Sequence, residues 1–244
     1  MSANVLVVRA AGSNCENETA WAFELAGATT EIVHINRWLD NPDLLDDFQA
    51  LAIPGGFSYG DDIASGRIFA NQLRFNLMDS IQKLLDRKGL ILGICNGFQV
   101  LVKAGLLGNN SVTLTHNDSG KYIDTWVSLK KTSNNSIFFK GIDNLELPIA
   151  HAEGRIVLQN NNSSEKITAK EIALCYDGCN PNGSEGNIAG LCDDSGQILG
   201  LMPHPERYLR FENHPQWTRK KASDDGRGEG FAIFKNAVDY LNEL

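Results

Sequence analysis

The sequence lacks a long hydrophobic run and any excess of positive charge. No stretch approaches the roughly 18 apolar residues that a membrane-spanning helix needs. The short apolar run near the N-terminus has no basic leader, so we interpret it as a strand and not as a signal peptide. Lys and Arg number 22 against 30 Asp and Glu, which gives a formal net charge of −8. This balance disfavours binding to nucleic acids or to anionic membrane surfaces.

Cysteine is also scarce, and its pattern excludes a disulfide framework. The chain has five cysteines, an odd number, at positions 15, 95, 175, 179 and 192. We therefore expect free thiols and a reducing, cytoplasmic location. Cys175 and Cys179 lack the paired cysteine or histidine spacing that is typical of zinc sites, so we expect no metal.

A nucleotide-binding loop is missing as well. Gly55, Gly56 and Gly60 make a glycine-rich segment, but no lysine follows Gly60 as a phosphate-binding P-loop requires. The G-x-G-x-x-G spacing of dinucleotide sites does not occur there either. We therefore expect no cofactor in this chain.

The first hundred residues contain short apolar runs that alternate with helical patterns. The runs are strand candidates at Val5–Val8, Ile32–Ile35, Leu51–Ile53 and Leu90–Ile94. The helical patterns cover Asn17–Gly27, Ile63–Arg87 and Gly97–Gly105. Strands that are apolar throughout and separated by helices predict a three-layer α/β fold, in which a mainly parallel sheet has helices on both faces.

After about residue 111 the pattern predicts antiparallel additions to this sheet or a small sheet beside it. Polar and apolar residues alternate over Thr113–Lys131, and further strand candidates follow at Arg155–Leu158, Ile172–Cys175, Ile188–Cys192 and Ile198–Met202. Asn160–Lys166 and Asn180–Glu185 have the composition of turns. The polar segment Arg210–Gly230 is either a solvated loop or a partner-binding segment, and an amphipathic helix follows at Phe231–Leu241. No break in composition divides the chain, so we expect residues 1–244 to form one domain.

The segment Gly93–Gly97 has the G-x-nucleophile-x-G pattern of a nucleophile elbow, with Cys95 at its centre. A sharp turn between strand and helix would lift Cys95 above the sheet. The N-terminus of the helix would face the sulfur, which favours the thiolate, and the N–H of Asn96 would face a developing oxyanion. Such a cysteine without a base is more often a buried structural residue.

A base for this nucleophile is available at His204, at the end of another strand pattern. Active sites of parallel α/β sheets gather at the carboxyl ends of the strands, so Cys95 and His204 can meet there. Glu206 lies in the same proline-stiffened segment and can orient the imidazole, as the third member of a triad does. The three residues predict covalent hydrolysis of an amide through a thioester.

These segments resemble a known family. CNGFQ at Cys95–Gln99, PHPE at Pro203–Glu206 and the upstream Pro54–Gly56 are similar to motifs of class I, triad-type glutamine amidotransferases. More narrowly, the segments PGGFSYGDD, PIAHAEGR and LMPHPER resemble glutaminase subunits of phosphoribosylformylglycinamidine synthase, and GSNCE and NPNGS match as well. The resemblance spans nearly the whole chain and implies the flavodoxin-like fold of class I glutamine amidotransferases.

The resemblance also implies roles for individual residues. Cys95 would attack the side-chain amide of L-glutamine, with His204 as base and then acid and Glu206 as the residue that orients His204. Oxyanion and substrate contacts carry over to Gly55, Gly56, Phe57, Asn96 and Gln99. The main chain of His151–Glu153 would hold the amino-acid end of the substrate.

The implied function needs partners. Ammonia would pass to an ATP-dependent synthase subunit, which would bind ATP and Mg²⁺ and convert formylglycinamide ribonucleotide to formylglycinamidine ribonucleotide in purine biosynthesis. A small accessory subunit of the same complex is a further candidate partner. Two alternatives stay open: a stand-alone cysteine amidase or γ-glutamyl hydrolase, and a non-catalytic regulatory module of the same fold.

Other cysteine and histidine residues have local interpretations. Ser13 and Glu16 fit a capping box at the first helix, so we expect Cys15 between them to have no direct part in chemistry. His116 and His214 are expected in loops.

Overall fold

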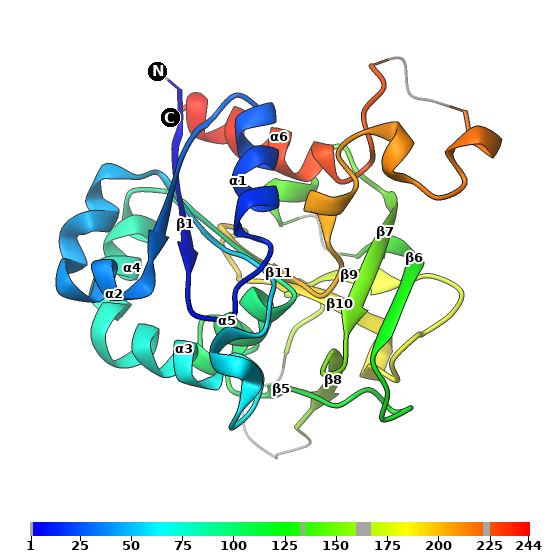
Figure 1. The fold of residues 1–244 in the computed structure, drawn as a ribbon, viewed down its shortest axis with the longest axis horizontal. Coiled ribbons are helices and arrows are strands. Elements are labelled where there is room, and N and C mark those ends of the chain that lie inside the picture. The colour runs from blue at the N-terminus through cyan, green and yellow to red at the C-terminus, as the bar shows by residue number, and fades with distance from the viewer. Residues whose placement is uncertain (1, 133–134, 160–166, 222–224) are drawn as a thin grey trace.

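A computed structural model describes residues 2–132, 135–159, 167–221 and 225–244 (Figure 1). Its centre is a nine-stranded sheet with the order β2-β1-β3-β4-β11-β10-β9-β6-β7, and β5 pairs with β8 in a second, two-stranded sheet. The turn that the sequence predicts at Asn160–Lys166 lies outside the described residues.

Five strands make the parallel half of the large sheet. They are β2 (Thr29–His34), β1 (Asn4–Arg9), β3 (Ala50–Ile53), β4 (Leu90–Ile94) and β11 (Ile198–Leu201). Strands β3, β4 and β11 are buried at every position, as expected for parallel strands that are covered on both faces. The strands predicted in the first hundred residues are all present. The prediction that Ile198–Met202 is an antiparallel addition is wrong for its pairing with β4, which is parallel.

The other half of the sheet is antiparallel. It contains β10 (Ile188–Cys192), β9 (Ile172–Tyr176), β6 (Ile123–Lys131) and β7 (Asn144–His151), while β5 (Val112–Thr115) and β8 (Arg155–Leu158) form the small sheet. Strand β7 was not predicted, because it contains Pro148, which cannot donate to a ladder. It lies at the end of the strand order, and an edge strand tolerates proline.

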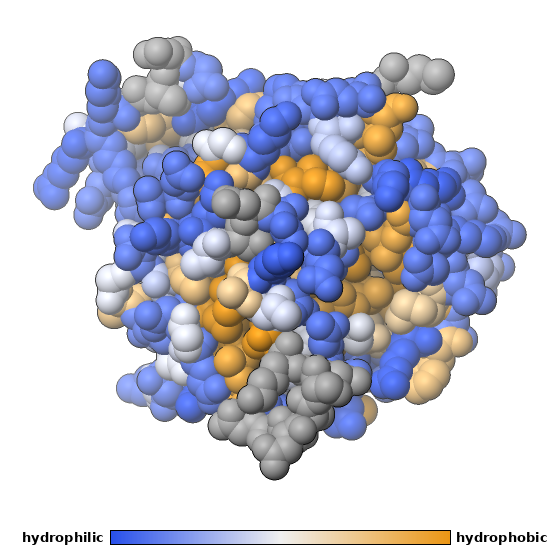
Figure 2. Space-filling view, turned by 180° about the vertical axis from the view of Figure 1, so that it is seen from behind, coloured by the Kyte–Doolittle hydropathy of each residue, from blue (hydrophilic) through white to orange (hydrophobic). Residues whose placement is uncertain are grey.

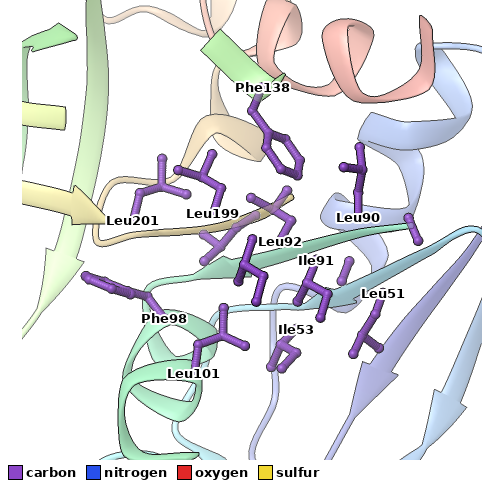
Figure 3. Packing of buried hydrophobic residues seen from close by; sticks show 14 of the residues in the cluster. Leu51, Ile53, Leu90, Ile91, Leu92, Phe98, Leu101, Phe138, Leu199 and Leu201 are labelled. Atoms are coloured by element: carbon purple, nitrogen blue, oxygen red, sulfur yellow. The ribbon is translucent and has the colours of Figure 1, made fainter. Parts of the chain in front are cut away.

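Helices cover both faces of the parallel half. They are α1 (Glu16–Leu25), α2 (Ile35–Asp40), α3 (Arg67–Gln72), α4 (Met78–Asp86), α5 (Asn96–Ala104) and α6 (Phe231–Asn242). Helices α1 and α6 pack together through Phe23 and Phe234, whose ring centroids are 5.0 Å apart. Figure 3 shows Phe138 on the side of β4 and β11 that faces α6, and Phe98 and Leu101 on the side of α5. The predicted three-layer arrangement is therefore present.

The helix predicted over Ile63–Arg87 is shorter and divided. Gly66 has a φ of +73°, which lies outside the helical region, so α3 begins at Arg67. A π-helical segment, η3 (Leu73–Leu77), then joins α3 to α4. Short 3-10 turns complete the chain at η1 (Pro42–Asp47), η2 (Ser58–Asp61), η4 (Ile137–Phe139), η5 (Glu185–Asn187) and η6 (Pro205–Arg207).

The polar segment Arg210–Gly230 is mostly exposed where the structure describes it, with residues 222–224 outside that part, although Phe211 and His214 are buried. It holds η7 (Phe211–Asn213) and η8 (Trp217–Arg219). His214 lies in the loop between η7 and η8, as the sequence predicts, but its side chain is not exposed to solvent. Its ring is buried between Trp126 and Tyr208, at centroid distances of 4.4 and 5.7 Å.

The surface mixes polar and apolar areas. Figure 2 shows the molecule from behind, with hydrophilic side chains along the rim and hydrophobic side chains in areas between them. Among the described residues, no helix combines the length and the apolar character that crossing a membrane requires.

Candidate active site

Cys95 occupies a strained turn between β4 and α5. Its backbone has a φ of 52° and a ψ of −103°, a conformation that non-glycine residues rarely adopt and that marks nucleophile elbows. The turn is fixed on both sides. The Cys95 N–H donates to the Leu201 carbonyl of β11 (2.8 Å), and the Cys95 carbonyl accepts from the Gln99 N–H (3.1 Å). The structure thus contains the predicted elbow.

The two glycines of the elbow let the backbone pass very close to its neighbours. A Cβ atom at Gly97 would lie 1.9 Å from the carbonyl oxygen of Ile53 in β3. A Cβ atom at Gly93 would lie 2.5 Å from Leu101 Cδ1 of α5. Any side chain here would push α5 away from the sheet, so glycine keeps the positive N-terminus of the helix beside Cys95.

His204 and Glu206 follow β11, the strand next to β4. Leu201 of β11 lies in register with Ile94 of β4, so both strands deliver their following residues to the same edge. Both side chains are buried, and His204 Nδ1 lies 2.6 Å from Glu206 Oε1. This contact fixes a proton on Nδ1 and leaves Nε2 for proton transfer, as in a catalytic triad.

The charges around His204 favour its protonated form. Burial by itself would lower the pKa of His204, but the neighbouring Glu206 and Cys95 raise it well above the usual value. His204 Nε2 has no hydrogen-bond partner within the described part of the chain. The Cys95 thiol lies close enough to act on that pKa, and its hydrogen-bond contact is with the Ala150 carbonyl at 3.8 Å. The structure therefore brings the predicted nucleophile and base together.

A cavity of about 250 Å³ opens beside Cys95. Its walls include Gly56, Phe57, Gln99 and the segment 151–153. Pockets for drug-sized ligands range from about 300 to 1,000 Å³, so this one suits a single amino acid. Gly55 lies behind the wall, where a Cβ atom would be 2.9 Å from His204 Cε1.

Two of the predicted contact residues are already engaged by the protein. The Phe57 N–H donates to the Gly12 carbonyl (2.9 Å), which leaves Gly56 and Asn96 as the candidate oxyanion donors. Gln99 Oε1 accepts from Asn96 Nδ2 (2.9 Å), and Gln99 Nε2 donates to the Glu153 carbonyl. Gln99 therefore connects α5 to the pocket wall, and its contact with a substrate stays a prediction.

The position of the His151 side chain in the cavity wall was not predicted from the sequence. His151 lines the cavity, and its Nδ1 lies 3.0 Å from Asn117 Oδ1. Burial and the charge of His204 lower the pKa of His151 to about 4, so it is neutral at physiological pH. The motif NPNGS was the feature of the sequence that could have pointed to this wall. Its Asn182 is buried and donates to the Gly154 carbonyl (2.8 Å), directly after the segment 151–153 that lines the cavity.

The capping box predicted around Cys15 is wrong. Ser13 Oγ accepts from the Ala10 N–H (3.0 Å), and Cys15 itself stands at the N-cap position without a side-chain cap. The Cys15 thiol is instead grouped with His204 and Glu206, and donor atoms of the three residues lie within 4.8 Å of one another. Such a group could hold a metal ion, but Arg207 already donates to Cys15 Sγ (3.1 Å), and a metal would have to displace that cation.

Comparison with known proteins agrees with this geometry. Residues 2–241 match the CobB/CobQ-like glutamine amidotransferase domain. The chain is 42% identical over 255 residues to phosphoribosylformylglycinamidine synthase subunit PurQ of Dehalococcoides mccartyi, which covers 98% of both chains. The chain belongs to the PurQ family. A second PurQ, from Methanococcus maripaludis, is 41% identical and covers 98% of this chain and 97% of its own.

The PurQ family assignment extends to the fold. A structure of PurLQS from Thermotoga maritima superposes with a TM-score of 0.76 at 34% identity, covering 99% of this chain and 100% of that chain. The family, the α/β fold and the enzyme class that the motifs predict are thereby confirmed.

Proposed function

We propose that this chain hydrolyses L-glutamine at Cys95 and supplies the ammonia to an ATP-dependent synthase subunit. The partner would bind ATP and Mg²⁺ and convert formylglycinamide ribonucleotide to formylglycinamidine ribonucleotide. A small accessory subunit would complete the complex. Five free cysteines suit a reducing cytoplasm as the location.

The first half of the reaction forms a thioester. The Cys95 thiolate attacks the side-chain amide carbon of glutamine, and the N–H groups of Gly56 and Asn96 stabilise the oxyanion. The His204 imidazolium donates its proton to the departing nitrogen, so the C–N bond breaks and ammonia leaves. A γ-glutamyl thioester remains on Cys95.

Hydrolysis of the thioester returns the enzyme to its starting state. Neutral His204 takes a proton from water, the resulting hydroxide attacks the thioester carbon, and the C–S bond breaks. Glutamate leaves and Cys95 is again a thiolate beside an imidazolium. Glu206 holds the ring of His204 in place throughout.

The buried contact between His204 and Glu206, next to the strained Cys95, is the observation that carries this proposal. The pocket supports glutamine as the substrate, because the carboxylates of Asp61 and Glu153 line it and suit the ammonium group of an amino acid. The segment 151–153 also lines this pocket, which is consistent with the role that the family resemblance implies for its main chain.

Synthesis assays with the partner test the proposal. Cys95→Ala should abolish glutamine-dependent synthesis and leave ammonia-dependent synthesis by the complex largely intact, because only the ammonia source is lost. Retained glutamine-dependent synthesis would show that another residue is the nucleophile. Glutamine hydrolysis by the isolated chain should be weak and should rise when the synthase subunit is added; full hydrolysis without it would contradict the coupling.

A panel of substrates distinguishes the proposed glutaminase subunit from a stand-alone hydrolase. The small cavity predicts a preference for free glutamine over a γ-glutamyl peptide. The opposite preference would favour a γ-glutamyl hydrolase, and a Cys95 that resists a glutamine-analogue electrophile would favour a regulatory module.

A further inference from the structure

The mechanism above leaves one buried thiol at the site unused. Cys15 lies at the start of α1 with a relative exposure of 1%. Its sulfur donates to Asn14 Oδ1 (3.1 Å) and accepts from the Arg207 guanidinium (3.1 Å). Burial raises the pKa of the Cys15 thiol, so this residue stays protonated and can serve in both contacts.

The thiol stands directly behind the catalytic imidazole. A Cβ atom at Gly55 would lie 2.9 Å from His204 Cε1 and 3.2 Å from Cys15 Sγ. The imidazole and the thiol therefore both border the space that a side chain at Gly55 would fill. The absence of a side chain at Gly55 makes room for them. Donor atoms of Cys15, His204 and Glu206 form one cluster within 4.8 Å.

Glu206 presents an unused oxygen inside this cluster. Its Oε1 holds His204, but its Oε2 is buried and has no hydrogen-bond partner in the described part of the chain. Arg207 is the next residue and interacts electrostatically with Glu206. A buried carboxylate oxygen without a partner attracts a guanidinium strongly, so the contact of Arg207 with Cys15 needs a reason.

We propose that Cys15 is a positioning residue that holds the Arg207 guanidinium away from Glu206 Oε2, so that the negative charge of Glu206 acts on His204. This inference rests on the proposed roles of Cys95, His204 and Glu206. Without the thiol, Arg207 turns to Glu206 and forms a charge-assisted pair. The carboxylate then stabilises the His204 imidazolium less, and the His204 pKa falls.

Loss of the Cys15 thiol leaves the other charged and titratable groups near His204 unchanged. They are Glu206 itself, Cys95 at the elbow, His151 at the end of β7 and Tyr122 before β6. Cys15 also raises the pKa of His204 directly. Cys15→Ala can therefore lower this pKa by two routes, and removal of Arg207 reverses only the route through Glu206.

The rate at which a γ-diazoketone analogue of glutamine alkylates Cys95, followed by mass spectrometry across a range of pH, tests the proposal without a partner subunit. Cys15→Ala should slow alkylation by roughly tenfold at mildly alkaline pH, the factor for one pKa unit. The alkaline limb, where His204 loses its proton, should move to lower pH. Cys15→Ser should behave nearly as the wild type, because a hydroxyl can also accept from Arg207.

The double variant Cys15→Ala/Arg207→Met tests whether Arg207 carries the effect of losing Cys15. Once the cation is removed, nothing competes for Glu206, so the alkaline limb should return toward its wild-type position. Cys192→Ala is the matched control, because Cys192 is also buried and donates to the Lys170 carbonyl, far along the sheet. Thermal midpoints of all variants show whether each chain is folded.

The outcomes separate this inference from the proposed function. A wild-type chain whose Cys95 is not alkylated would overturn the proposed function. A reactive wild type with an unchanged Cys15→Ala profile would overturn the role of Cys15 alone. If alkylation slows equally in Cys15→Ala and in the double variant, Arg207 does not turn to Glu206 when the thiol is absent. This result would also contradict the proposal.

Discussion

At the scale of single residues, two neighbouring histidines are held in opposite protonation states. Glu206 and Cys95 raise the pKa of His204, although its burial acts the other way. Burial and the charge of His204 lower the pKa of His151 to about 4. The surroundings of each ring are therefore enough to make one histidine a proton donor and to keep the histidine beside it neutral.

The low pKa of His151 predicts a loss of stability in acid. The unfolded chain takes up a proton at this histidine near pH 6.5, whereas the folded chain takes it up only near pH 4. This contribution to stability is present above pH 6.5 and is lost as the pH falls to about 4, by about 3 kcal/mol in total. Urea unfolding at several pH values measures it.

His151→Asn provides the comparison, since the amide can keep the contact with Asn117 Oδ1 that the ring makes at 3.0 Å. The variant should lose less of its free energy of unfolding than the wild type between pH 6.5 and 4. Parallel curves for the two proteins would show that His151 takes up its proton normally in the folded state.

At the scale of elements, the site depends on how closely α5 approaches the sheet. The first turn of α5 lies against β3, and its N-terminus faces Cys95 only because Gly97 has no side chain. A substitution at Gly97 therefore affects the whole junction between β4 and α5.

Gly97→Ala should therefore destabilise the chain by at least about 2 kcal/mol, because a methyl group would meet the Ile53 carbonyl at 1.9 Å. Chemical unfolding measures the change. Gly120→Asn is the control: its φ is +63°, which asparagine tolerates, and a Cβ atom there meets nothing within 4 Å. A Gly97→Ala variant as stable as this control would mean that α5 can shift without cost.

The sequence revealed the parallel strands because each is a short run of apolar residues that is covered on both faces. It missed β7, whose Pro148 is tolerated only at a sheet edge. It also assigned Cys15 to a local cap, since Ser13 and Glu16 have the right spacing. The true neighbours of Cys15 are His204 and Arg207, which come from the far end of the chain, and no local pattern can reveal such a contact.

At the scale of the whole molecule, exposed apolar side chains surround the mouth of the site. Phe57 lines the cavity, and Ile63 lines an adjoining hollow that shares Asp61 and Glu153 with it. The side chains of both residues are exposed, Ile63 by 65%. Exposed apolar groups at a mouth often mark a partner surface, and the ammonia transfer that we propose would bring the synthase subunit to this place.

Ile63→Asp should accordingly weaken association with the synthase subunit by roughly tenfold or more, in the range of an interface anchor. Calorimetric titration of the two subunits measures the affinity. Phe75→Asp is the matched control, because Phe75 is 73% exposed but lines none of the described cavities. An equal loss in both variants would indicate a general effect of apolar surface.

Trapping the covalent intermediate would show whether Cys95 is the nucleophile. The chain, with its partner present, is mixed with isotope-labelled glutamine, quenched in acid and digested, and the peptides are analysed by mass spectrometry. We expect a labelled γ-glutamyl thioester on Cys95 that is absent from Cys95→Ala. Label on another residue, or glutamine turnover in Cys95→Ala, would contradict it.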